Sequence, residues 1–115
     1  MLDLRKRTKT FAHDCVKIAS TLPNTDFGRH LKDQLSRSAT SVAVNYRATS
    51  LAQSKAAFIA KLSIVLEEAD ESHFWLEFIK DENLNSSPQL IILEKEASEL
   101  TAIFIKSRIT ASNNK

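Results

Sequence analysis

The sequence predicts an all-α fold, an up-down-up-down antiparallel four-helix bundle in which residues 1–115 form a single domain. Two observations predict it. One glycine and two prolines in 115 residues leave little turn chemistry for β-hairpins. Apolar residues recur every three or four positions in four segments, at about 4–21, 27–49, 55–80 and 88–110, which short polar breaks separate. A chain of this length can bury a core without disulfides or metal ions.

Several classes of protein are excluded by composition. The single cysteine, Cys15, excludes an intrachain disulfide. The longest apolar runs are a few residues long, far below the roughly 18 residues that a membrane-spanning helix needs. The chain lacks a positively charged leader followed by an apolar run and a small-residue cleavage site, so we expect a soluble, cytoplasmic protein.

The first helix has a basic side opposite its apolar side. Asp3 is a suitable N-cap, and Leu22-Pro23-Asn24 ends the helix. The stripe expected to face the core is Leu4, Thr8, Phe11, Cys15, Ile18 and Leu22. Its place on that stripe predicts that Cys15 is a buried small hydrophobe rather than a reactive thiol. On the opposite side, a narrow arc at about 100° per residue holds the basic ridge, which is Lys6, Lys9, His13 and Lys17. The ridge is either an ordinary solvated face or an anion-binding face.

The second helix has an unusually polar core stripe. Thr25 or Asp26 can cap it, and the stripe reads Phe27, Leu31, Leu35, Ser38, Val42, Asn45 and Thr49. Buried polar side chains need hydrogen-bond partners, and candidates on the next helix are Glu68, Ser72 and His73. We therefore predict a structural polar network, with a ligand site as the alternative; its members are Ser38, Ser41, Asn45, Glu68 and Ser72. Asn45 should be buried and should bond Glu68 or Ser72.

The third helix follows a short break at 50–54, where Ser50 or Ser54 can serve as the N-cap. Its inward residues are Phe58, Leu62, Val65, Ala69, Ser72, Leu76 and Ile79. Apolar and aromatic residues also lie off this stripe, and an exposed patch of that kind is typical of an interface. The predicted oligomer interface combines these residues with three outward residues of the second helix, and comprises Arg37, Val44, Arg47, Ile64, Glu67, Glu71, Phe74, Trp75 and Phe78.

The fourth helix begins at Ser87-Pro88, a cap followed by proline at the first helical position. Its core stripe is Leu90, Leu93, Ala97, Leu100 and Phe104. A second apolar strip lies to one side and comprises Ile91, Ala102, Ile105 and Ile109. The surplus of apolar faces on three helices predicts a homo-oligomer.

Charge is distributed unevenly along the chain. Residues 1–55 carry ten Lys/Arg against four Asp/Glu, a net +6, and residues 56–115 carry six against ten, a net −4. Arg37 and Arg47 are expected on one outer face and Glu67 and Glu71 on another. A contact that pairs different faces is therefore favoured between copies, and such heterologous contacts close into rings when the rotation allows.

Three consecutive segments resemble the bacterial four-helix bundle proteins known as the 23S rRNA-intervening-sequence protein family: RSATSVAVNYRA (37–48), S-x-x-x-F-I-x-K-L-x-I (54–64) and EEADESHFWLEFI (67–79). The residues that carry the resemblance are Phe11, Ala12, Gln34, Leu35, Arg37, Ser38, Thr40, Ser41, Asn45, Phe58, Glu68, Glu71 and Trp75. The chain departs from close relatives by having Ala39 and Ala43 where they tend to have glycine, and Ala48 where they tend to have glutamate.

The resemblance implies a ring-forming accessory protein without enzymatic activity. Members are encoded inside insertions in large-subunit rRNA genes or as free-standing genes. The related accessory proteins of diversity-generating retroelements form homopentameric rings that bind nucleic acid and a reverse transcriptase. For this chain the resemblance therefore implies a homopentamer, with nucleic acid and either a reverse transcriptase or an RNA as partners.

Three functions are open at this point. A nucleic-acid-binding accessory would use the basic ridge without sequence specificity, and its affinity would fall steeply with salt. A protein–protein interaction scaffold would bind itself and another protein, but no nucleic acid. A metalloenzyme is disfavoured, because Asp70-x-x-His73 is one pair where ferritin-like sites need two E-x-x-H pairs and two further glutamates. Neither His13 nor His30 has a Cys or His neighbour at metal-ligand spacing. We expect no catalytic residue, no metal and no cofactor.

Overall fold

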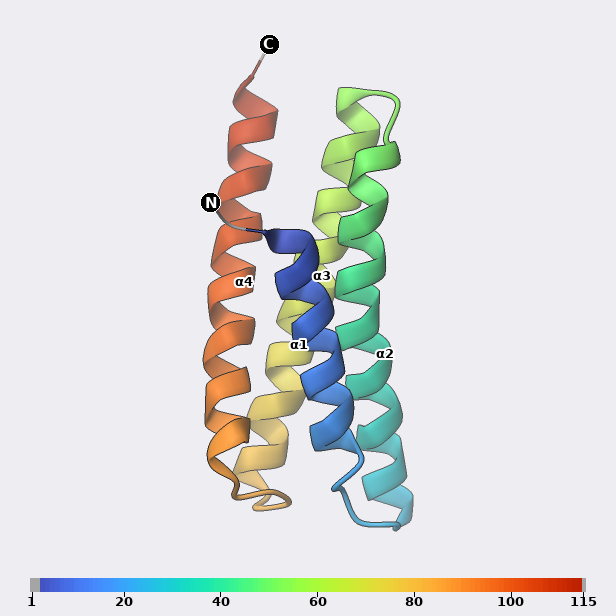
Figure 1. The fold of residues 1–115 in the computed structure, drawn as a ribbon, viewed down its shortest axis with the longest axis vertical. Helices are drawn as coiled ribbons and strands as arrows, with labels where there is room; N and C mark the ends of the chain where they lie inside the picture. The colour runs from blue at the N-terminus through green and yellow to red at the C-terminus, as the bar shows by residue number, and fades with distance from the viewer. Residues whose placement is uncertain (1–2, 115) are drawn as a thin grey trace.

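Four antiparallel α-helices make up the computed structural model, which describes residues 3–114 (Figure 1). The helices are α1 (Leu4–Ala19), α2 (Asp26–Ala48), α3 (Lys55–Asp81) and α4 (Pro88–Asn113), and a 3-10 turn, η1 (Thr49–Leu51), follows α2. Each helix packs along its neighbours in chain order, and α1 also contacts α4. No strand occurs in residues 3–114. The predicted four-helix bundle is therefore confirmed.

Side chains at the helix starts explain most of the boundaries. The side chains of Asp3, Thr25 and Ser54 each accept a hydrogen bond from a backbone N–H three residues later, at 3.0 Å. Gly28 lies in the first turn of α2, where a Cβ atom would stand 1.9 Å from the carbonyl oxygen of Pro23. The approach of the α1–α2 turn therefore requires glycine at this position.

The core is continuous along the bundle and draws on all four helices. Phe11 and Phe104 are its largest fully buried side chains. Four residues of the predicted core stripes are less buried than expected: Leu4, Asn45 and Phe58 are half-buried, and Phe27 is 49% exposed. Phe27 lies in the first turn of α2, where its ring contacts Phe78 at a centroid distance of 5.7 Å instead of entering the core.

The helices differ in length, and this leaves one end of the bundle with three helices. At 1.5 Å per residue, the 16 residues of α1 span about 24 Å, whereas the 27 residues of α3 span about 40 Å. Figure 1 shows that α1 stops short of the end at which α2 passes into α3. Tyr46, in the last turn of α2, packs against Phe104 of α4 with the ring centroids 5.6 Å apart.

Cys15 is fully buried on the inner side of α1. Burial raises the pKa of its thiol well above the ordinary value, and the nearby charge of Asp14 raises it further. The thiol therefore stays protonated and unreactive at neutral pH. Within residues 3–114, no helix is both long enough and apolar enough to span a bilayer.

Candidate binding surfaces

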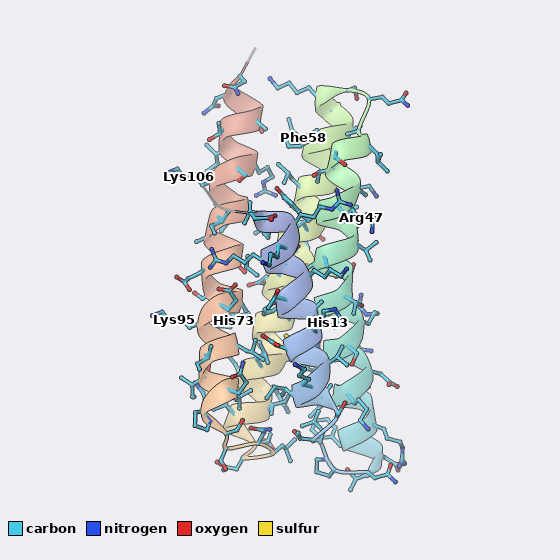
Figure 2. All side chains as sticks on the ribbon, in the orientation of Figure 1. His13, Arg47, Phe58, His73, Lys95 and Lys106 are labelled. Atoms are coloured by element: carbon cyan, nitrogen blue, oxygen red, sulfur yellow. The ribbon has the colours of Figure 1, made fainter. Side chains whose placement is uncertain are left out.

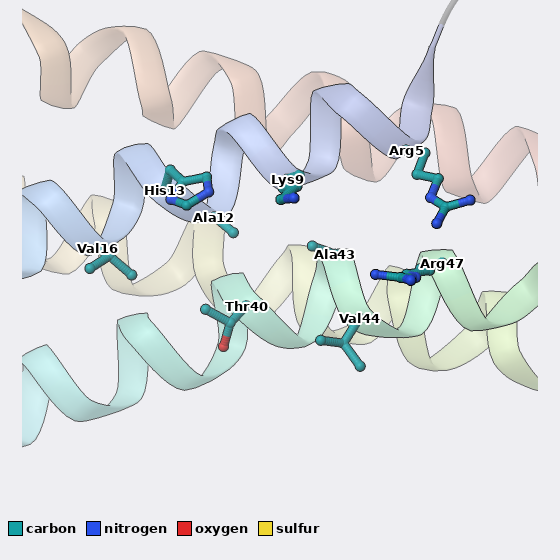
Figure 3. Close-up of a pocket in the computed structure, with 9 residues that line it drawn as sticks. All are labelled: Arg5, Lys9, Ala12, His13, Val16, Thr40, Ala43, Val44 and Arg47. Carbon is teal, nitrogen blue, oxygen red and sulfur yellow. The ribbon is translucent and has the colours of Figure 1, made fainter.

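A groove of about 450 Å³ runs between α1 and α2 (Figure 3). Its floor is apolar, because small and aliphatic side chains of both helices line it, and cationic side chains stand around it. The lining residues are Arg5, Lys9, Ala12, His13 and Val16 of α1 and Thr40, Ala43, Val44 and Arg47 of α2. None of the described lining residues is acidic. We refer to this feature as the α1–α2 groove.

Helical spacing explains how these side chains come together. Arg5, Lys9 and His13 recur every four residues and so share one side of α1, which faces the groove. Arg47 approaches from α2, and Figure 3 shows the Arg5 and Arg47 guanidinium groups near one another at one end. Within residues 3–114, no ion pair joins Arg5, Lys9 or Arg47 to a carboxylate. Convergent positive charges without a counterion favour an anionic ligand.

Arg7 of α1 has a different environment from Arg5 and Lys9. Arg7 points toward α4, where its Nε and Nη2 atoms donate to the two carboxylate oxygens of Glu96, both at 2.7 Å. Glu99 lies 3.8 Å from the same guanidinium group. The hydrogen bond to Glu96 raises the pKa of Arg7, with the carboxylate charges adding to it against a smaller effect of burial. The positive charge of α1 is therefore neutralised where the helix faces α4, and it lacks a carboxylate partner where the helix faces α2.

The structure divides the basic ridge that the sequence predicts. Lys9 and His13 line the α1–α2 groove, whereas Lys6 and Lys17 are exposed outside it. Lys17 lies 3.9 Å from Asp14 on the same helix. Arg5 was not assigned to any surface from the sequence, although it stands four residues before Lys9 and this spacing could have indicated that both share one side of α1.

Where α2 packs against α3, charged side chains of the two helices pair with each other. We call this contact the α2–α3 seam. The Arg37 guanidinium group bonds Glu68 at 2.9 Å and also bonds Glu71. Burial alone would lower the pKa of Arg37, but the hydrogen bond to Glu71 and both carboxylate charges outweigh it and raise the pKa. The expectation that Arg37 and Glu71 belong to two separate outer faces is wrong. The antiparallel packing of α2 and α3 places them in contact within one chain.

The predicted polar network lies partly in this seam. Ser38 and Ser72 are fully buried, and their Oγ atoms are 3.0 Å apart, in hydrogen-bond contact between α2 and α3. Ser72 Oγ also donates to the carbonyl oxygen of Glu68 at 2.8 Å.

Asn45 has different partners from those expected, and this prediction is wrong. Its side chain is half-buried and donates to the carbonyl oxygen and the hydroxyl of Ser41, both at 2.9 Å. Lys61 Nζ donates to Asn45 Oδ1 at 3.4 Å. Because α2 and α3 are antiparallel and Ser38 meets Ser72, Asn45, two turns further along α2, lies nearer the start of α3. The long side chain of Lys61 reaches it there.

An aromatic cluster closes the seam near the start of α2. The Trp75 ring contacts His30 at 5.8 Å and Phe74 at 5.0 Å between centroids, and its Nε1 atom donates to Glu71 at 3.3 Å. Trp75 and Phe78 are half-buried and pack against the core, whereas Phe74 is 52% exposed. Of the three aromatics predicted on the outer side of α3, only Phe74 is mainly solvent-facing.

The remaining predicted interface residues fall into two places. Val44 is 64% exposed and, with Arg47, lines the α1–α2 groove. Ile64 is 41% exposed, and Glu67 is exposed one turn further along α3. Ile64, Glu67 and Phe74 share the side of α3 that points away from the core, and we call this surface the outer α3 face.

One cluster of metal-ligating side chains occurs in residues 3–114, formed by His73, Glu77 and Glu94 with ligand atoms within 4.8 Å of one another. Both carboxylate oxygens of Glu94 already bind Lys80 Nζ, at 2.9 and 2.8 Å. The hydrogen bond to Glu94 raises the pKa of Lys80, so the charged ammonium group competes with a metal ion for the Glu94 oxygens. The Asp70-x-x-His73 pair considered in the sequence does not form this cluster, because Asp70 is exposed and outside it.

Comparison with known proteins adds a family and a fold. The sequence matches the family described as 23S rRNA-intervening sequence protein over residues 1–106. A crystal structure of a protein of unknown function from the S23 ribosomal protein family of Bacteroides thetaiotaomicron is similar, with a TM-score of 0.82 and 30% sequence identity. The similarity covers 90% of this chain and 96% of that chain. No curated protein matches.

Proposed function

We propose that this chain, which belongs to the 23S rRNA-intervening sequence protein family, is a non-enzymatic, ring-forming accessory protein that binds nucleic acid electrostatically. The observation that carries the proposal is the set of exposed cations on α1. Lys6 and Lys9 have no carboxylate partner within residues 3–114, and the weak contact of Lys17 with Asp14 leaves its side chain 80% exposed. Such groups are free to contact phosphates.

The geometry favours backbone contacts over base recognition. Lys6 and Lys17 are separated along α1 by about 16 Å at 1.5 Å per residue, a distance that spans several phosphates of a strand. No aromatic side chain belongs to the basic ridge, so there is no platform on which bases could stack. Binding should therefore depend on counterion release and should not depend on base sequence.

A ring would strengthen these weak contacts. A single copy offers few phosphate contacts, whereas several linked copies bind together with much higher affinity when their geometry allows it. Homopentamers are expected from the resemblance to ring-forming accessory proteins, and the same resemblance supports a reverse transcriptase or an RNA as the partner.

The test compares two double charge reversals in one titration. Lys6→Glu/Lys17→Glu removes the two ridge lysines that lie outside the α1–α2 groove, and Lys95→Glu/Lys106→Glu changes two exposed lysines of α4 by the same net charge. Fluorescence anisotropy with duplex and single-stranded oligonucleotides, at low and near-physiological salt, should show a loss of binding that is much larger for the ridge variant. Equal losses in both variants would mean that net charge, and not the ridge, determines the affinity.

The alternative function is a protein–protein interaction scaffold that binds no nucleic acid. Exposed Phe27 and Phe74 favour it, because both contact Phe78 and apolar side chains gathered at a surface are typical of interaction sites. The same titration separates the two functions. Wild-type protein that binds no oligonucleotide even at low salt, but still associates with itself, would be a scaffold.

A further inference from the structure

We infer that the α1–α2 groove is a docking site for a second copy of this chain, and that it receives the outer α3 face of that copy. The inference rests on the self-association in the proposed function and assigns the two surfaces that carry it. Two observations support it: the surfaces are complementary in charge, and each has apolar groups that its own chain leaves exposed.

The groove offers an apolar floor between unpaired cations. Ala12 and Ala43 are small, so a helix can approach the backbones of α1 and α2 closely between them. Val44 is 64% exposed in the isolated chain. Arg5, Lys9 and Arg47 surround this floor with no carboxylate partner in residues 3–114 (Figure 3). An acidic helix with an apolar side would satisfy both features.

The outer α3 face has these properties. Ile64 and Phe74 are 41% and 52% exposed, and they flank Glu67. Glu67 and its neighbour Asp70 are exposed, and neither forms an ion pair within residues 3–114. From Ile64 to Phe74 the face is about 15 Å long, and the α1 side of the groove, from Arg5 to Val16, is about 16 Å long. The two surfaces therefore match in length as well as in charge.

The other exposed apolar surface of the chain fits the groove less well. The strip on α4 includes Ile91, Ile105 and Ile109, all more than 40% exposed. Lys95 and Lys106 project from the same helix on its outer side (Figure 2). Their ammonium groups would meet the cations of the groove, and like charges brought together at an interface are unfavourable.

The two matched surfaces are on different sides of the bundle. The groove lies between α1 and α2, whereas the outer α3 face belongs to a helix that does not pack on α1 in the described residues. One copy can therefore engage two neighbours, one at each surface, and such a contact produces a closed ring or an open filament. It would also cover Lys9 and His13, leaving Lys6 and Lys17 outside the contact for phosphates.

A charge-reversal pair tests this contact directly. Arg47→Glu places a carboxylate in the groove, and Glu67→Arg places a cation on the outer α3 face; both positions are exposed, so both variants should fold. In sedimentation velocity each variant alone should associate more than about tenfold more weakly than wild type. The double variant Arg47→Glu/Glu67→Arg should recover association, because each of its grooves then meets a face of opposite charge. The matched controls are Lys106→Glu and Glu82→Arg, which should associate as wild type does.

Other outcomes identify other occupants. A wild type that stays monomeric at micromolar to millimolar concentration overturns the inference. So does association that neither variant weakens, or that the double variant does not recover. If Arg47→Glu lowers oligonucleotide affinity without any effect on association, a phosphate backbone occupies the groove. The Lys6→Glu/Lys17→Glu variant separates the two proposals, because it should lose oligonucleotide binding and keep its association.

Discussion

Two exposed arginines of α2 face different neighbouring helices and have opposite surroundings. Arg37 faces α3, where Glu68 and Glu71 neutralise it. Arg47 faces α1, where the nearest charged groove residues, Arg5 and Lys9, repeat its own sign. The α2–α3 seam is complete within one chain, whereas the α1–α2 groove lacks a counter-charge. This difference indicates which side of α2 holds the fold together and which side is available to another molecule.

The seam should be the more sensitive of the two regions to substitution, and a matched pair on α2 measures this. Ser38 is fully buried in the seam, and Thr40, two residues later, is exposed at the edge of the groove. Ser38→Leu forces a larger side chain into a packed core and should cost about 1–3 kcal/mol of unfolding free energy. Thr40→Leu should change it by less than about 0.5 kcal/mol.

Urea denaturation of both variants checks this first prediction. The unfolding free energy of the wild type is the reference. The slope of that free energy against urea concentration should be the same in all three proteins if only stability differs. Equal losses of unfolding free energy in the two variants would mean that the groove side of α2 is packed as tightly as the seam.

Asn45 should have a smaller effect than Ser38. It is half-buried and bonds Ser41 in its own helix, with a long contact to Lys61 across the seam. Asn45→Leu should therefore cost about 0.5–1.5 kcal/mol, the usual net value of hydrogen bonds that water can partly replace. Asn45→Asp separates the two contacts, because it keeps the size of the side chain and an acceptor for Lys61 but removes both hydrogen bonds that the amide donates to Ser41. A larger loss than for Ser38→Leu, seen as a greater fall in Tm, would show that Asn45 is central to the seam.

The sequence predicted the four helices and most core residues, because burial repeats along a helix with a period that can be read from one chain. Side-chain partners between helices were harder to predict. Periodicity tells which side of α2 faces the core, but not that Ser38 meets Ser72 or that Lys61 reaches Asn45. The pairing of Arg37 with Glu71 was missed for the same reason. It depends on the axial register of α2 against α3, which tertiary packing determines.

Most residues of the α1–α2 groove were predicted from the sequence to lie on a surface, but the sequence did not predict that they form one groove. Lys9 and His13 were assigned to one surface, Val44 and Arg47 to another, and Arg5 to none. They line one groove because α1 packs alongside α2 in an antiparallel direction, which brings the first turn of α1 to the last turn of α2. A helical wheel describes each helix separately, so it cannot show a site shared by two helices.

The smallest expected effect concerns the two arginines themselves, and salt should reveal it. Arg37→Ala removes the only described ion-pair partner of Glu68 and Glu71. Half of the Arg37 side chain is exposed and water screens the pair, so the loss of unfolding free energy should be at most about 1 kcal/mol. Arg47→Ala removes repulsion from Arg5 and Lys9, so it should leave stability unchanged or raise it slightly. Added salt weakens both effects, because it screens attraction at the seam and repulsion at the groove alike. Thermal unfolding at low and high salt should therefore show two differences of opposite sign that both shrink toward zero. The measurements should be made at protein concentrations at which the wild type is monomeric, so that association between copies does not contribute to Tm. Two differences of the same sign would contradict the contrast between a neutralised seam and an open groove.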